Sequence, residues 1–315
     1  MFSPDAYLPR FFLRNGHLNT IWAYLFRNAS KLPFERILLT TPDDDFLDVD
    51  IFASRNGKCA VLVHGLEGSS SSSYMTSMSQ VLHLKGWDVA ALNLRGCSGR
   101  DNKQYYAYHS GQTDDLELLC NYLCDKYANI VLLGFSLGGN VVLKYAGSRV
   151  VPQAVKAVIG ISVPIHLRST ALKLEQWQNY FYSLRFLNSL KSKLKKKVEK
   201  FKTQSLSIEI DTIRTIRQFD EVYTAPANQF TDADDYYKKS SSVNFLENIS
   251  VPFLLINALD DPFLTHECFP LPSVSVGDAH FVFPKYGGHV GFWTNKGKHS
   301  KHEEWVLQFL ASKGL

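Results

Sequence analysis

One serine of the chain lies between two glycines in the pattern Gly-x-Ser-x-Gly. This serine is Ser136, in Gly134-Phe-Ser-Leu-Gly-Gly139; a strand is expected over Ile130–Leu133 and a helix over Asn140–Tyr145. A sharp strand-to-helix turn forces such a residue into a strained conformation, which small flanking residues allow. The turn also raises the hydroxyl above the carboxyl edge of a sheet, near the positive end of the helix. We therefore expect Ser136 to be a nucleophile.

A serine hydroxyl needs a base to become nucleophilic, and the base needs an acid to orient it. After Gly-x-Ser-x-Gly, the acid and then a histidine are expected, each just past the end of a strand. His289 lies in Gly-Gly-His-Val-Gly after the expected strand Phe281–Phe283, and we interpret it as the base. Asp261 precedes a proline after Pro252–Ala258 and is the expected acid, with its neighbour Asp260 as the alternative.

Other histidines and cysteines of the chain are less suited to chemistry. Three histidines, expected at a strand start or on the surface, are weaker candidates for the base: His280, His299 and His302. The last two imitate metal-ligand spacing together with Glu303, but we expect that set to be solvated on a terminal helix. Cys120 and Cys124 lie four residues apart, and no second Cys/His pair completes a zinc site. The prediction is no metal and no organic cofactor.

A tetrahedral oxyanion requires two preorganised backbone N–H donors. One is expected from Leu137, directly after the nucleophile. The other is expected from the loop after an earlier strand, where His64-Gly-Leu-Glu-Gly68 has the matching pattern and Leu66 supplies the N–H. We expect His64 to hold this loop.

Strand-like runs alternate with helical patterns along the chain, which predicts a mostly parallel α/β sheet flanked by helices on both faces. The expected strands are Arg36–Thr41, Val49–Ala53, Cys59–His64, Trp87–Leu92, Ile130–Leu133, Val155–Ile161, Pro252–Asn257 and Phe281–Phe283. The other expected helices are Tyr74–Lys85, Gly111–Tyr127 and Glu303–Ala311. With 315 residues, 45% of them hydrophobic, we expect a single domain over residues 1–315.

Residues 164–243 interrupt this rhythm with lysines, leucines and aromatics, and we expect a helical cap inserted in the domain. Apolar residues from Phe181 to Phe201 recur every three or four positions, as on one face of a helix. The lysines between them are expected in water, or in weak peripheral contact with anionic lipid: Lys191, Lys193, Lys195, Lys196, Lys197 and Lys200. Four aromatics are expected to line an acyl pocket or simply to pack: Trp177, Tyr180, Tyr182 and Phe186.

The overall composition narrows the class of protein. The formal charge is only +4, and no basic stripe accompanies a recognisable module, so we expect no nucleic-acid partner. Five scattered cysteines are typical of free thiols in a reducing compartment. The first residues lack the apolar run of a signal peptide, and no apolar run reaches the length of a spanning helix. The expected location is cytoplasmic.

Several spaced motifs together resemble the α/β-hydrolase superfamily: HGLEG, NLRGCSGR, YHSGQTDDL, GFSLGGN, NALDDPF and GGHVGFW. With the opening RNGHLNTI, the chain is similar more narrowly to the YheT-like branch of serine esterases. The resemblance implies an α/β-hydrolase fold, a triad of Ser136, Asp261 and His289, and hydrolysis of carboxylic esters. Arg95 and His109 match family motifs, and we expect Arg95 to pin a loop and His109 to line the pocket. Animal relatives begin with a membrane anchor, which we do not expect here.

The function that these residues favour is a serine hydrolase acting on a small-molecule ester through an acyl-enzyme. Acyl transfer or thioester cleavage is an alternative, because the same triad serves those reactions. A non-catalytic scaffold is a second alternative, although such proteins usually lose a member of the triad. Dehalogenase and epoxide hydrolase chemistry is disfavoured, since those relatives place an aspartate where Ser136 stands.

Overall fold

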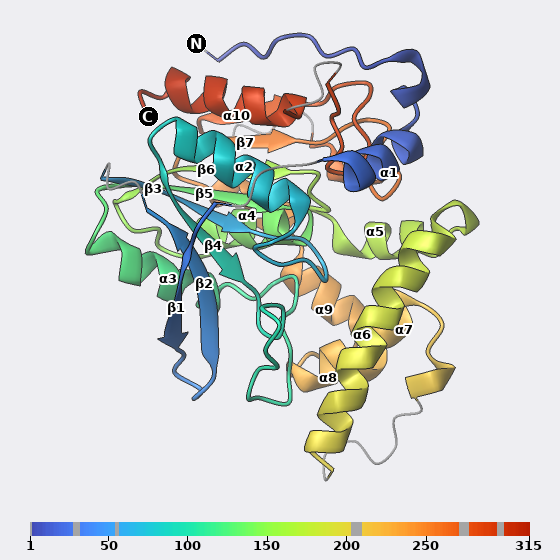
Figure 1. Cartoon of the computed structure of the whole chain (residues 1–315). Helices are drawn as coiled ribbons and strands as arrows, with labels where there is room; N and C mark the ends of the chain where they lie inside the picture. Colours follow the sequence, from blue (N-terminus) through green and yellow to red (C-terminus); the bar gives the residue numbers. More distant parts are fainter. Residues whose placement is uncertain (1, 28–31, 54–56, 203–209, 271–276, 295–298) are drawn as a thin grey trace.

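A single eight-stranded sheet organises the chain in the computed structural model, which describes residues 2–27, 32–53, 57–202, 210–270, 277–294 and 299–315 (Figure 1). The strand order is β1-β2-β4-β3-β5-β6-β7-β8. β2 (Phe46–Phe52) pairs antiparallel with β1 (Glu35–Thr40) and with β4 (Asp88–Asn93), and all the other pairs are parallel. The remaining strands are β3 (Lys58–Val63), β5 (Asn129–Phe135), β6 (Val155–Ile161), β7 (Phe253–Ile256) and β8 (Ala279–Val282). The predicted fold class is confirmed.

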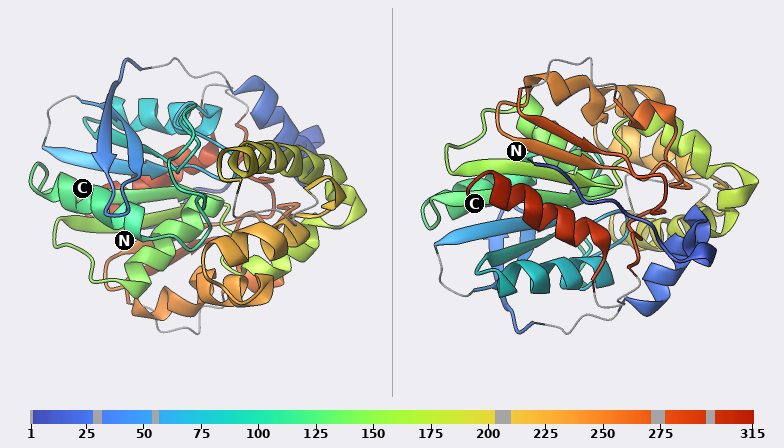
Figure 2. Two further views of the ribbon diagram at one scale, coloured as in Figure 1. Left: turned by 90° about the horizontal axis from the view of Figure 1, so that it is seen from below. Right: turned by 90° about the horizontal axis from the view of Figure 1, so that it is seen from above.

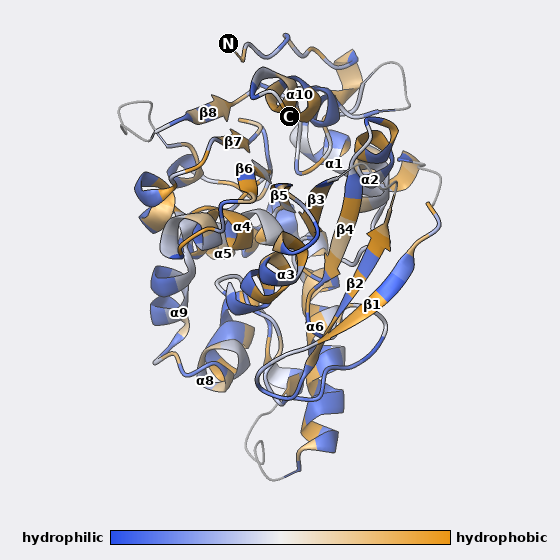
Figure 3. Cartoon of the chain, turned by 90° about the vertical axis from the view of Figure 1, so that its left-hand side faces the viewer, coloured by the Kyte–Doolittle hydropathy of each residue, from blue (hydrophilic) through white to orange (hydrophobic). Residues whose placement is uncertain are grey.

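The central strands are apolar on both faces because helices cover both faces. β3 is buried from Cys59 to Val63, and the central strands carry mostly the hydrophobic colour in Figure 3. α3 (Asp114–Cys124) and α4 (Leu137–Ser148) pack on one face. α2 (Ser73–Leu84) and α10 (Lys301–Ser312) pack on the other. Both layers are visible in Figure 2. This arrangement leaves the carboxyl ends of the parallel strands for the site.

The predicted strands and helices are all present, with their ends shifted by a few residues. One helix, α1 (Gly16–Phe26), was not expected. Asn15 caps it by accepting a hydrogen bond from the Leu18 amide, a signal that the sequence does offer. Its buried residues are small or polar, namely Gly16, Asn19 and Ala23, so the usual apolar stripe is absent.

The segment between β6 and β7 forms a helical layer over the site. It contains α5 (Leu167–Leu174), α6 (Tyr180–Lys200), α7 (Ile216–Phe219), α8 (Ala225–Ala227) and α9 (Ala233–Ser240). The described part of residues 164–243 includes no strand, and residues 203–209 lie outside the description. Figure 1 shows α6 to α9 as a lobe beyond the sheet edge. In the described chain, even the 21-residue α6 is too polar to cross a membrane, and no other helix is long and apolar enough.

Contrary to the expectation from the sequence, two lysines of α6 do not lie free in water. Lys197 is only 7% exposed, and its Nζ donates hydrogen bonds to Asn102 Oδ1 and to the Gln104 carbonyl. Lys193 Nζ forms an ion pair with Glu67 at 2.9 Å. The prediction was wrong for these two residues because α6 packs them against the loops of the sheet domain.

Candidate active site

Ser136 occupies the turn between β5 and α4, with φ 51° and ψ −120°. Glycines are required on both sides because the backbone passes close to its neighbours. A Cβ at Gly134 would lie 2.2 Å from the Gly138 carbonyl oxygen, and one at Gly138 would lie 2.3 Å from the Val63 carbonyl oxygen. The strained turn expected from Gly-x-Ser-x-Gly is therefore present, and it holds Ser136 at the carboxyl edge of the sheet.

The structure brings three of the predicted residues into one hydrogen-bonded line. His289 Nε2 lies 2.9 Å from Ser136 Oγ, and His289 Nδ1 lies 2.8 Å from Asp261 Oδ2. In the tautomer that this arrangement requires, Nδ1–H donates to the carboxylate and Nε2 accepts from the serine hydroxyl. The buried Asp261 also accepts a hydrogen bond from the Phe263 amide at 2.9 Å, which fixes the carboxylate in place.

Asp260, the alternative acid, points elsewhere. Its Oδ1 accepts a hydrogen bond from the Gly288 amide at 2.8 Å, so it braces the loop that carries His289. Burial raises the pKa of Asp260 to about 6, with the neighbouring Asp261 charge adding to the shift. Of the two candidates left open by the sequence, Asp261 is the one hydrogen-bonded to His289.

Three residues that the sequence did not single out hold His289 in position. Thr20 Oγ1, on α1, accepts a hydrogen bond from the His289 amide at 2.8 Å. Ser162 Oγ, just after β6, accepts one from the Val290 amide at 2.8 Å. The Phe263 ring packs on the imidazole at a centroid distance of 4.3 Å. Thr20 belongs to the RNGHLNTI motif and Phe263 ends the NALDDPF motif, so both had a usable signal, whereas Ser162 lies in none of the motifs.

The loop after β3 runs directly beside the serine. A Cβ at Gly65 would lie 3.1 Å from Ser136 Cβ, and Leu66 and Leu137 line the same cavity as Ser136. His64 is fully buried; its Nδ1 donates to the Gly65 carbonyl at 2.7 Å, and its Nε2 accepts from the Leu94 amide. Burial lowers the pKa of His64 to about 4, so the imidazole is neutral and serves the loop.

Glu67 ties this loop to the cap. Its backbone has φ 53°, and its carboxylate accepts hydrogen bonds from Tyr108 Oη at 2.7 Å and from Lys193 Nζ at 2.9 Å. Ser189, also on α6, donates to the other carboxylate oxygen. The loop beside Ser136 and the cap helix are therefore joined through one carboxylate.

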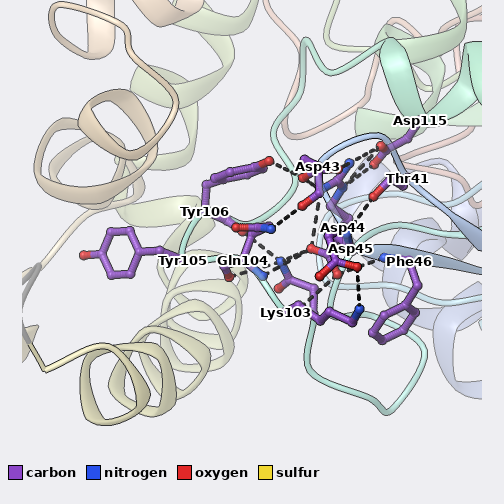
Figure 4. A network of polar contacts seen from close by, with 12 residues as sticks. Thr41, Asp43, Asp44, Asp45, Phe46, Lys103, Gln104, Tyr105, Tyr106 and Asp115 are labelled. Atoms are coloured by element: carbon purple, nitrogen blue, oxygen red, sulfur yellow. Dashed lines mark hydrogen bonds and ion pairs between the residues drawn. The ribbon is translucent and has the colours of Figure 1, made fainter.

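Arg95 is a structural residue, as expected. Its guanidinium pairs with Asp115 at 2.6 Å and with Asp43 at 2.5 Å. Asp45, in the same network, accepts hydrogen bonds from the Lys103 amide and the Asn102 side chain, each at 2.8 Å (Figure 4). These contacts join the β1–β2 turn to residues 102–104, the same segment that bonds to Lys197 of the cap. Arg95 thus fixes the β1–β2 turn in place, at a position remote from the reacting groups.

An apolar cavity lies between Ser136 and the cap. Its empty space, which includes the part open to solvent, is about 1080 Å³. Most of its wall comes from the cap and the neighbouring loops: Leu66, Leu174, Phe186, Leu190, Ile216 and Phe219. His109 also lines it, as expected, and burial lowers the pKa of His109 to about 3. Of the four aromatics expected to line an acyl pocket (Trp177, Tyr180, Tyr182 and Phe186), only Phe186 lines the cavity.

A second group of cavity residues is charged. It consists of Glu67, Lys193, Lys197 and Asp220. Burial lowers the pKa of Lys197 to about 8 and raises the pKa of Asp220 to about 6. The cavity therefore combines an apolar wall with a few polar positions.

The weaker histidine candidates for the base belong to other parts of the fold. His280 belongs to β8, as expected for a residue at a strand start. His302 is fully buried between Phe135 and Phe292, and burial lowers its pKa to about 3, so the expectation of a solvated residue was wrong. His302 is buried because it lies on the side of α10 that packs against the sheet. Within the described ranges, no group of three or more His, Cys, Asp or Glu side chains is placed to hold a metal ion.

Comparison with known proteins agrees with the fold. Residues 61–296 match the family described as alpha/beta hydrolase fold, and the chain belongs to that family. The fold, the site and the relatives define an α/β hydrolase of the esterase and lipase type.

Within that family the chain belongs to the YheT-like branch. It is 31% identical to YheT of Escherichia coli (strain K12), over 99% of this chain and 96% of that protein. It is also 27% identical to a monoacylglycerol lipase of Saccharomyces cerevisiae, covering 86% of this chain and 62% of the yeast protein. Human phospholipase ABHD3 is 25% identical, covering 91% of this chain and 74% of that protein. The esterase Pf2001 of Pyrococcus furiosus has a similar fold, with a TM-score of 0.61 at 17% identity over 99% of this chain and 98% of the esterase chain.

Proposed function

We infer that this enzyme hydrolyses carboxylic esters through an acyl-enzyme formed on Ser136, with His289 as the base and Asp261 as its orienting acid. The observation that carries this proposal is the hydrogen-bonded line from Asp261 through His289 to Ser136 at the floor of an apolar cavity. In such an arrangement a neutral imidazole accepts the serine proton while the carboxylate stabilises the imidazolium that forms.

Acylation begins when Ser136 Oγ attacks the ester carbonyl carbon and His289 Nε2 takes the hydroxyl proton. The carbonyl oxygen becomes an oxyanion, and the proposed donors that stabilise it are the backbone N–H groups of Leu66 and Leu137, both of which line the cavity. The carbon–oxygen bond to the alcohol then breaks, and the leaving alcohol takes the proton back from His289. The products of this half-reaction are the free alcohol and an ester between the acyl group and Ser136.

Deacylation uses the same groups. A water molecule gives a proton to His289 and attacks the acyl carbon, passing through a second oxyanion at the same two N–H groups. The bond to Ser136 Oγ breaks, the serine recovers its proton from His289, and the carboxylic acid leaves. Atoms and charges balance without a further reactant.

The proposed substrate is a small-molecule ester with an apolar acyl chain. The cavity wall supports this, because leucine, isoleucine and phenylalanine side chains surround the space next to Ser136. The names of the yeast monoacylglycerol lipase and human phospholipase ABHD3 indicate lipid esters for those relatives. We also place the enzyme in the cytoplasm, which its five free cysteines support.

The test is hydrolysis of p-nitrophenyl esters from acetate to palmitate by the wild type and by Ser136→Ala. We expect turnover by the wild type, loss of turnover in the variant, and a chain-length optimum set by the cavity. Product analysis in the presence of an added alcohol measures acyl transfer on the same site. A well-folded wild type that turns over none of these esters, or a Ser136→Ala variant that retains full turnover, would contradict the proposal.

A further inference from the structure

Helix α1 has its polar face inside and its apolar face outside. Asn19 Oδ1 accepts a hydrogen bond from the Trp293 amide, and Thr20 Oγ1 accepts one from the His289 amide. Arg27, at the end of the helix, donates to the carbonyls of Val290 and Gly291. A surface helix normally turns its apolar stripe to the core, so the polar inner face leaves the apolar residues of α1 in solvent.

These outward residues, with those of the segment before the helix, are large and exposed. The members of this group include Leu8, Phe11, Leu18, Ile21, Leu25 and Phe26, with exposed fractions between 43% and 85%. The rings of Trp22 and Phe26 pack against each other in a tilted arrangement at a centroid distance of 4.3 Å. Isolated exposed apolar residues are ordinary, but a contiguous group of this kind marks a contact with another apolar surface.

The start of α6 extends the same surface. Its exposed residues are Tyr180, Phe181 and Leu184, and Trp177 in the short 3-10 helix just before α6 is counted with them; Trp177 and Phe181 are each at least 80% exposed. The start of α6 lies near α1, and the rest of α6 runs away from it (Figure 1). Two contacts join them: the Arg185 guanidinium lies 4.4 Å from the Tyr24 ring centroid, and His17 stacks on Tyr182 at 5.8 Å. We call the exposed residues of α1, its preceding segment and the start of α6 the entrance patch.

The charges around the entrance patch are positive. Arg10, Arg14 and Arg185 are exposed beside its apolar residues, and the sequence from Ala6 to Phe34 contains no Asp or Glu. From Lys173 to Val198 the only acidic residue is Glu175. Aromatic and aliphatic residues bordered by arginines are the composition of a surface that lies in the headgroup region of an anionic bilayer. We propose that the entrance patch docks this protein on an anionic lipid surface.

The position of the entrance patch gives this docking a consequence for catalysis. Tyr182 packs on Phe263 at a centroid distance of 4.8 Å, and Phe263 packs on the catalytic imidazole of His289. Docking through the entrance patch would therefore bring the lipid surface close to the reacting groups. This consequence rests on the proposed ester hydrolase, whereas docking itself does not require turnover.

The lysine-rich part of α6 is a different candidate for the same contact. There Lys195 pairs with Asp211 at 2.8 Å and Lys196 lies 3.8 Å from Asp101, so acidic groups of the protein already offset these charges. The stretch also lacks the exposed aromatic residues of the entrance patch. The experiment separates the two surfaces.

The experiment is co-sedimentation of the full chain with vesicles of phosphatidylcholine containing phosphatidylglycerol and with vesicles of phosphatidylcholine alone. The test variant is Phe11→Ser combined with Phe181→Ser. We expect the wild type to bind the anionic vesicles more tightly, with an affinity that falls as salt rises. Each lost phenylalanine should lower the partition coefficient about tenfold. Ser136→Ala should bind as the wild type does, so a failure of docking and a failure of the proposed chemistry can be told apart.

Two matched controls complete the design. Leu84→Ser with Val150→Ser removes two equally exposed apolar residues elsewhere, and Lys195→Gln with Lys196→Gln removes the lysine charges; both should bind as the wild type does. No binding to the anionic vesicles, or binding lost in either control but kept in the test variant, would overturn the proposal. Light scattering without lipid provides the last check: a stable dimer that Phe11→Ser with Phe181→Ser dissociates would assign the entrance patch to a second copy and overturn lipid docking.

Discussion

Replacing Thr20 by valine removes one oxygen from the support of the proposed catalytic base. In the wild type Thr20 Oγ1 accepts a hydrogen bond from the His289 amide and donates one to the Gly16 carbonyl, at 2.8 and 2.7 Å. Valine has the same shape and no hydroxyl, so the His289 N–H loses its acceptor while the packing is kept. The loop is also confined by Gly288, where a Cβ would lie 2.6 Å from Thr20 Oγ1.

The size of the effect follows from the unpaired amide. A buried N–H left without a partner costs about 1–3 kcal/mol, and this one is partly buried. If the loop moves so that the His289 amide finds another partner, the imidazole moves out of hydrogen-bond distance of Ser136. A cost of about 1–3 kcal/mol in the activation free energy corresponds to a loss of roughly 5- to 150-fold in kcat/KM. Because the lesion displaces the base and leaves the cavity intact, kcat should fall while KM changes little.

The assay compares Thr20→Val with Thr20→Ser in steady-state ester hydrolysis and in urea unfolding. Serine keeps the oxygen, so Thr20→Ser should retain kcat close to the wild type. The reasoning is refuted if Thr20→Val and Thr20→Ser have equal kcat, or if the valine variant loses binding affinity for the ester with kcat unchanged.

Three further predictions follow from the cavity and the loops. Burial raises the pKa of Asp220 from its ordinary value near 3.8 to about 6, so the stability of the wild type falls as the pH rises from about 4 to 6 and the carboxylate ionises. Asp220→Asn lacks this loss, so in urea unfolding its stability relative to the wild type should increase between about pH 4 and 7, by at most about 3 kcal/mol. An equal stability difference at about pH 4 and at about pH 7 would contradict this prediction. In Gly16→Ala the new Cβ would lie 1.8 Å from the Asp260 carbonyl oxygen, so we expect the free energy of unfolding in urea to fall by at least about 2 kcal/mol. A variant as stable as the wild type would contradict this packing. Leu190→Trp fills the cavity and should shift the optimum in the p-nitrophenyl ester series to shorter chains, whereas an unchanged optimum would place the acyl chain elsewhere.

The sequence was informative where local geometry leaves few choices. The glycines around Ser136 have no room for a Cβ, and the buried strands are apolar on both faces, so both patterns are visible in the residues themselves. The choice between Asp260 and Asp261 could not be made, because adjacent carboxylates differ only in the direction in which the folded loop turns them.

The parts that the sequence did not predict depend on contacts between distant segments. α1 was missed because its buried face is polar and bonds to the loop of residues 287–293, which periodicity cannot reveal. His302 was placed in solvent because its burial depends on packing against Phe135 and Phe292 from other elements. Lys197 was misplaced in the same way, since its partners Asn102 and Gln104 lie far away in the chain.

The central claim is that Ser136 is a nucleophile activated by His289, and covalent labelling tests it most directly. The wild type, Ser136→Ala and His289→Ala are treated with a fluorophosphonate, and the mass of each intact chain and of its peptides is measured. The account predicts a single adduct on Ser136 in the wild type, none in Ser136→Ala, and labelling slowed by orders of magnitude in His289→Ala. An unlabelled wild type, an adduct on another residue, or equal labelling rates with and without His289 would contradict it.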